Sequence, residues 1–176
     1  FICKQEGIDC DPEAINLIVA SSEGSMRDAE AKLNQIVNFF AGQKIKAEDV
    51  KSLLGLVDIN LLFELCEMLS HKDKAKALRF LNDNIEKGLD IQEFTKALVD
   101  YLRKLLILKI DPTLADLTLP GETDELKAHF IKQAENFEEN YLRKILDLVL
   151  EAENKTKYAS IIQLPLELAI IEAMGF

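Results

Sequence analysis

The chain has 176 residues, of which 48% are hydrophobic and 30% are charged. This much apolar surface can offset the entropy of ordering the chain, which excludes disorder as its main state. The 31 acidic residues outnumber the 21 basic ones and give a formal charge of −10. Such a surface repels phosphate, which disfavours non-specific nucleic-acid binding by this chain alone.

The three cysteines, Cys3, Cys10 and Cys66, are an odd number without C-x-x-C spacing, which argues against a disulfide framework and against a zinc site. They fit a reducing cytosol, and we expect a cytoplasmic protein. No signal peptide and no uncharged apolar run of about 18 residues is present. Because the chain starts at Phe1 without an initiator Met, we expect an excised fragment.

The first part of the chain predicts helices over residues 12–21, 25–40 and 47–54. Asp11 followed by Pro12 is a typical helix start, with an N-cap carboxylate before a proline at the first helical position. Ser25 opens the second helix, with Asp28 three residues later as its capping-box partner. Glycine ends each segment, at Gly24, Gly42 and Gly55.

Longer helices are predicted after Gly55. One ends near residue 70, and others cover 73–87, 90–109, 124–135, 137–154 and 160–174, with a loop over 112–122. Cys66 lies on the apolar face of the first of these and is expected to be core packing. Asp90 and Glu93 form a cap and box at the start of the third. Pro165 should either kink the last helix or mark its first turn.

No segment alternates apolar and polar residues with hairpin turn pairs, so no sheet is expected. The fold class is all-α. It consists of a small three-helix unit over residues 1–56 and a larger helical bundle over residues 57–176.

The sequence contains neither G-x-x-x-x-G-K-[ST] nor G-x-G-x-x-G, so it has no glycine loop to hold phosphates. His71 and His129 lack the partners of a di-iron bundle and are expected to be solvated. A metal-carboxylate enzyme is disfavoured because ligand spacing is absent. We predict no catalytic residue, no metal ligand and no enzymatic activity for this fragment alone.

Arg27 lies in the first turn of a predicted helix, where a cation opposes the helix dipole by about a few tenths of a kcal/mol. From composition alone, this placement is either tolerated, with Asp28 or Glu30 offsetting it, or it serves to bind an external anion.

The segments 98–110 and 161–174 are apolar on more than one side, which a surface helix does not require. Each is either a central helix of one bundle or part of a subunit interface. The candidate interface residues are Leu98, Leu102, Leu105, Ile162, Leu166 and Ile170.

Several motifs resemble one known family. They are Glu6-Gly7-Ile8, the run 23–29 with sequence EGSMRDA, the run 33–35 with sequence LNQ, the run 53–58 with sequence LLGLVD, and Pro165-Leu166-Glu167-Leu168-Ala169. In this order they resemble the lid and collar of the gamma/tau subunit of bacterial DNA polymerase III, an AAA+ clamp loader. Glu30 and Asn34 depart from the family, which more often has leucine and aspartate there.

The resemblance implies that residues 1–56 are the AAA+ lid and that residues 57–176 are the helical oligomerisation collar. It also implies that Arg27 is the sensor-2 arginine, which reaches the phosphates of ATP held with magnesium by the intact parent; the fragment alone would hold none. The parent would be an ATPase that loads the sliding clamp on primed DNA during replication. Its partners would be other loader subunits in a pentameric ring, with the clamp and primer–template DNA contacted through the missing N-terminal domain. The alternative is a stand-alone helical adaptor with no link to nucleotide.

Overall fold

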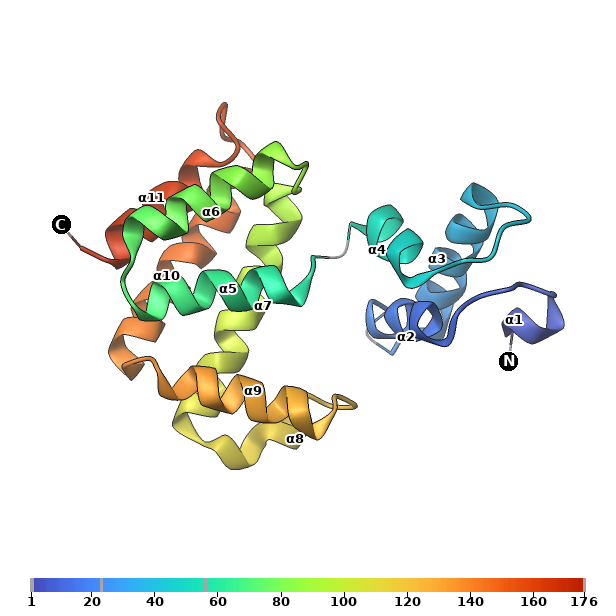
Figure 1. Cartoon of the computed structure of the whole chain (residues 1–176), viewed down its shortest axis with the longest axis horizontal. Helices are drawn as coiled ribbons and strands as arrows, with labels where there is room; N and C mark the ends of the chain where they lie inside the picture. The colour runs from blue at the N-terminus through green and yellow to red at the C-terminus, as the bar shows by residue number, and fades with distance from the viewer. Residues whose placement is uncertain (1, 23, 56, 176) are drawn as a thin grey trace. The chain divides into compact units, whose positions relative to one another are not determined.

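The computed structural model describes residues 2–22, 24–55 and 57–175 and, within them, contains helices and no strand (Figure 1). Its only described β-type pairing is an isolated bridge between Cys10 and Ile45. The prediction of an all-α fold is confirmed. Contacts divide the chain into unit 1, residues 1–58, and unit 2, residues 59–176. The division falls two residues beyond the predicted boundary, and the boundary residue Leu56 lies outside the described residues.

Unit 1 contains α1 (Ile2–Gln5), α2 (Pro12–Ala20), α3 (Met26–Phe39) and α4 (Ala47–Leu54). The one-turn α1 was not predicted. A small apolar core joins α2, α3 and α4. Its buried members are Ala14, Ile18, Leu33, Ile36, Ile45 and Val50.

Both predicted caps of unit 1 differ in detail from the expectation. Asp11 is the N-cap residue of α2, but its side chain makes no capping hydrogen bond. Its carboxylate instead forms a 2.7 Å ion pair with Lys44, and its backbone N–H donates to the carbonyl of Ile45. Ser25 does cap α3, since its hydroxyl accepts from the backbone N–H of Asp28 at 3.3 Å. The backbone N–H of Ser25 donates to the Ser22 carbonyl, where a full capping box would use Asp28.

Unit 2 is arranged around α7 (Ile91–Ile110), its longest described helix. The helices α5 (Ile59–Ser70), α9 (Asp124–Glu135) and α10 (Glu139–Thr156) pack against α7, and α11 (Leu164–Ala173) packs against α10 and α6 (Lys74–Glu86). In Figure 1 the red α11 and green α6 lie side by side. Asp90 starts α7 as predicted, because its carboxylate accepts from the backbone N–H groups of Gln92 and Glu93.

Two further details of unit 2 differ from the sequence prediction or complete it. The predicted loop 112–122 contains a 3-10 turn, η1 (Pro112–Leu114), and a one-turn helix, α8 (Ala115–Thr118). Of the two roles left open for Pro165, the structure shows the first turn of α11. Proline is accommodated there because its missing N–H would have no helical acceptor.

Candidate functional site

The connection between α2 and α3 is held by serine side chains. Ser21 and Ser22 both donate their hydroxyl hydrogens to the carbonyl of Ile18, at 3.0 and 2.6 Å. Ser22 is buried, and its own carbonyl accepts from the backbone N–H of Ser25 at 2.8 Å. Gly24 turns the chain with φ of +80°, a left-handed conformation that glycine adopts without steric cost. The end of α2 and the start of α3 are therefore linked by a short chain of hydrogen bonds.

Arg27 follows this connection directly, in the first turn of α3. The turn is stabilised by the Ser25 cap and by the bond from the Ala29 N–H to the Ser25 carbonyl. The Arg27 side chain is exposed, and no described residue forms a hydrogen bond or ion pair with its guanidinium. Neither Asp28 nor Glu30 offsets its charge by direct contact, although both were predicted to be able to. An unpaired cation at this helix end is available to an external anion.

Lys32, on the same helix, makes a contact that was not predicted from the sequence. Its ammonium group donates to the carbonyl of Ser21, the C-cap residue of α2. A lysine eleven residues from its acceptor gives no sequence signal, because the contact depends on how α2 and α3 pack.

An apolar hollow of 150 Å³ lies on the same unit, lined in part by Val19 of α2 and by Met26 and Leu33 of α3. Val19 and Met26 are 57% and 64% exposed.

The structure places five of the six candidate interface residues inside unit 2. These five are at most 1% exposed and belong to its core: Leu98, Leu102, Leu105, Leu166 and Ile170. Because the chain itself already covers these five side chains, they fit the alternative of a central helix within one bundle. They have no exposed surface with which to contact a partner. Ile162 differs, since it is 45% exposed.

Four exposed apolar side chains of unit 2 lie in α11 or in the few residues before it. We call this set the α11 surface, and its members are Ile161, Ile162, Leu164 and Leu168. They are 41% to 54% exposed. The sequence signal was the all-round apolarity of 161–174, which indicated extra burial but not which positions lacked it.

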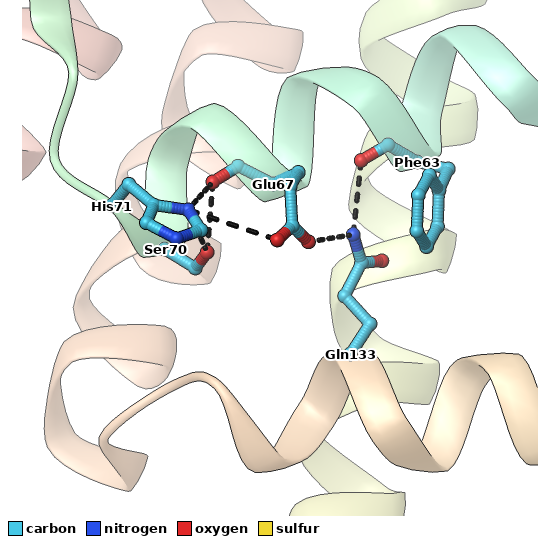
Figure 2. Close-up of polar contacts among 5 residues, drawn as sticks. All are labelled: Phe63, Glu67, Ser70, His71 and Gln133. Atoms are coloured by element: carbon cyan, nitrogen blue, oxygen red, sulfur yellow. Dashed lines mark hydrogen bonds and ion pairs between the residues drawn. The ribbon is translucent and has the colours of Figure 1, made fainter.

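Polar contacts between α5 and α9 form a second arrangement that was not predicted (Figure 2). The Gln133 amide, on α9, donates to the carbonyl of Phe63 at 2.9 Å and to the carboxylate of Glu67 at 3.4 Å. Its oxygen accepts from the hydroxyl of Tyr101 on α7 at 2.6 Å. Burial raises the pKa of Tyr101 well above its usual value, so the phenol stays a donor.

The two histidines are exposed, as predicted, but both have neighbours. His71 Nδ1 lies 2.8 Å from the carbonyl oxygen of Glu67, and the His129 ring stacks on Phe63 at 4.3 Å between centroids. Among the described residues, no group of three or more His, Cys, Asp or Glu side chains is placed to hold a metal ion. In that same part of the chain no helix has both the length and the apolarity needed to cross a membrane.

Two family models match the chain in succession. The model for the ATPase lid domain of the DNA polymerase III clamp loader subunit matches residues 1–42. The model for domain III of DNA polymerase III subunits gamma and tau matches residues 45–176. The second match includes α4, which packs in unit 1 because Val50 is buried in the core of that unit.

Curated proteins similar to this chain include two DNA polymerase III subunits. DNA polymerase III subunit tau of Bacillus subtilis (strain 168) is 24% identical over 97% of this chain and 30% of its own length. DNA polymerase III subunit gamma/tau of Mycoplasma genitalium is 33% identical over 55% of this chain and 16% of its own. Protein STICHEL-like 3 of Arabidopsis thaliana is 26% identical over 91% of this chain and 14% of its own. The chain thus spans less than a third of each of these relatives.

A solved structure supports the fold. The Bacillus subtilis DNA clamp loader delta protein (YqeN) superposes with a TM-score of 0.52 at 19% identity, covering 98% of this chain and 53% of that one. With the two family models covering nearly all residues, the expected family is confirmed. The chain belongs to the gamma and tau subunits of DNA polymerase III, of which it carries the clamp-loader ATPase lid and domain III.

Proposed function

We propose that this chain serves a larger ATPase subunit that loads a sliding clamp on primed DNA, with residues 1–56 as the lid and residues 57–176 as the assembly collar. Family membership supports the proposal, as does the succession of two helical units. The observation that carries it is Arg27, an exposed cation without a described partner on the capped first turn of α3.

The donor set of the lid fits a phosphate group. The guanidinium of Arg27 presents N–H donors in a planar fork, and no described carboxylate neutralises it. We assign to Arg27 a contact with a phosphate of ATP held together with magnesium by the intact subunit. When bound, ATP supplies a phosphoanhydride bond that the whole subunit hydrolyses. The fragment itself, without a glycine loop for the phosphates, would neither hold ATP nor hydrolyse it.

The phosphate contact would link ATP binding to the orientation of the lid. A charge-assisted hydrogen bond contributes about 1.5–3 kcal/mol. Made in only one of two lid orientations, that contact would shift their equilibrium by the same amount. Arg27 would in this way couple the presence of ATP to the orientation of the lid.

Unit 2 would assemble the loader, in a pentameric ring with other loader subunits. The α11 surface leaves four apolar side chains exposed for such a partner, and it retains Ile162 from the predicted interface. The formal charge of −10 disfavours direct binding of DNA by this chain. Contacts with the clamp and with primer–template DNA are therefore assigned to a preceding domain, and the assembly to the cytoplasm.

The test is Arg27→Ala in the full-length subunit, assembled in its loader. Loss of the charge-assisted contact should weaken ATP binding about tenfold to hundredfold. Clamp opening that depends on ATP should weaken with it, while the mass of the assembled loader stays unchanged. Arg79→Ala removes an exposed arginine from α6 of unit 2 and is the matched control, expected to behave as wild type.

Wild-type ATP affinity and clamp loading by the Arg27→Ala loader would refute the proposal. The chain would then be better described as a helical adaptor, whose α11 surface binds a partner without any link to nucleotide.

A further inference from the structure

We propose that Lys32 is a positioning residue for Arg27, acting through the connection between α2 and α3. This inference rests on the proposed function, because it concerns how Arg27 is presented to a phosphate. It assigns a role to a side chain outside the motif that resembles the family's lid.

The contact closes a ring of interactions on α3. Lys32 and Arg27 belong to the same helix, five positions apart. The Lys32 ammonium reaches back to the carbonyl of Ser21, where α2 ends. From there the chain passes to the buried Ser22, whose carbonyl accepts from the N–H of Ser25 at 2.8 Å. Ser25 in turn caps the helix turn that carries Arg27.

Charge strengthens this contact. The C-terminal end of a helix carries a partial negative charge on its free carbonyls, and a lysine there is favourable. Lys32 supplies this cation to α2 from a neighbouring helix. Its side chain is half-buried, so water screens the contact less than it would at an exposed site.

Without Lys32, the connection between α2 and α3 would lose one restraint close to Gly24, its conformationally freest residue. Gly24 lies between Ser22 and Ser25 with φ of +80°, and no described residue other than its chain neighbours has an atom within 4 Å of where a Cβ would be. Small rotations there are sterically cheap and would change the direction of the first turn of α3 relative to α2. The Arg27 guanidinium sits at the end of a long side chain, so such changes would displace it from a fixed phosphate.

The experiment uses the full-length subunit in its assembled loader and measures kcat and KM for ATP hydrolysis. Lys32→Met keeps the aliphatic stem and removes the donor. It should raise KM for ATP about threefold to tenfold with a smaller effect on kcat. Lys32→Arg keeps a cationic donor and should stay within about twofold of wild type.

Lys44→Met is the matched control. Lys44 is a lysine of the same unit that pairs with Asp11, at the opposite end of α2. Its loss removes one charge and one polar contact without touching the connection to α3. A KM unchanged in Lys44→Met and raised in Lys32→Met supports the positioning role; an equal rise in both would overturn it.

A double variant separates positioning from general stability. If Lys32 acts through Arg27, adding Lys32→Met to Arg27→Ala should leave KM at the value of Arg27→Ala alone. A full additional rise in KM would show that Lys32 acts independently, which overturns the inference. Wild-type KM in Lys32→Met, beside a raised KM in Arg27→Ala, overturns this inference alone. If Arg27→Ala also leaves KM unchanged, the proposed function fails and the positioning role falls with it.

Discussion

Gln133 ties three helices of unit 2 together, and replacing it with leucine should show what that tie contributes. The residue is 1% exposed, and its amide donates to the Phe63 carbonyl on α5 and to Glu67 one turn later (Figure 2). Its oxygen accepts from the Tyr101 hydroxyl on α7. Leucine has a similar size but offers neither donor nor acceptor. The core would therefore keep its volume and lose its polar contacts.

The cost follows from which groups are left without partners. Tyr101 is 4% exposed as a residue, and its buried hydroxyl would lose the acceptor that it now contacts at 2.6 Å. An unsatisfied buried donor costs about 1–3 kcal/mol. Loss of the hydrogen bond to Glu67 should cost less free energy, because the Glu67 side chain is 38% exposed and water can replace the amide. We expect Gln133→Leu to lower the free energy of unfolding of unit 2 by about 2 kcal/mol.

A double-mutant cycle tests this reasoning. Tyr101→Phe alone should cost about 1–2 kcal/mol, since it leaves the buried Gln133 oxygen without a donor. Added to Gln133→Leu, it should cost much less, because the unsatisfied hydroxyl is gone. The coupling energy should be about 1–2 kcal/mol. Gln92→Leu, at an exposed glutamine on α7, is the control and should change stability by less than about 0.5 kcal/mol.

Urea unfolding followed by tyrosine fluorescence is the suitable assay. The chain has no Trp, and its three Tyr residues, 101, 141 and 158, all lie in unit 2. The signal therefore reports on that unit even while unit 1 unfolds separately, and two tyrosines remain in the Phe variant. Slopes against urea should match those of the wild type. Strictly additive costs of the two substitutions would refute the assigned role of the Tyr101–Gln133 bond.

Two further predictions concern α11 and the cysteines. Leu166→Asp should unfold unit 2, since Leu166 is 0% exposed. Leu168→Asp, at a position 54% exposed on the same helix, should lower the mass of the assembled loader in solution while its circular dichroism stays native. An unchanged loader mass in Leu168→Asp would remove the α11 surface from the proposed interface. Burial raises the pKa of Cys10 to about 11 and raises that of the fully buried Cys66 further, so neither thiol should be alkylated by iodoacetamide at pH 8 in the folded chain, as mass spectrometry would show. Because the pKa of Cys10 is raised in the folded chain, the contribution of this thiol to stability is present below its ordinary pKa near 9 and is lost as pH rises through 11. Alkylation of Cys10 should increase between these two pH values. Rapid labelling of both thiols at pH 8 would contradict the burial argument.

Local signals in the sequence were sufficient for most helices. The prediction of 47–54 matches α4 residue for residue, and Asp90 starts α7 with the hydrogen bonds expected of a cap. Capping, proline placement and glycine stops act within about one turn, so neighbouring residues contain all the information needed. The one-turn α1 and α8 escaped prediction because four residues show no helical periodicity.

Contacts between residues far apart in the sequence could not be predicted in this way. The sequence showed that 98–110 and 161–174 needed burial on several sides, but a helix can be covered equally by its own chain or by a partner. Only the packing of α7 against α5, α9 and α10 decided that Leu98, Leu102 and Leu105 lie in the core. Only the position of α11 on α6 and α10 decided which of its apolar side chains remain exposed.

The candidate site divides in the same way. The sequence by itself determined the helical class, the cap at Ser25 and the place of Arg27 in the first turn of α3, because these depend on residues a few positions apart. The absence of a described partner for Arg27, and the contacts of Lys32 and Gln133, were decided by tertiary structure alone. Periodicity reports how much apolar surface a helix must cover, whereas pairing between distant side chains depends on where the packed helices bring their atoms together.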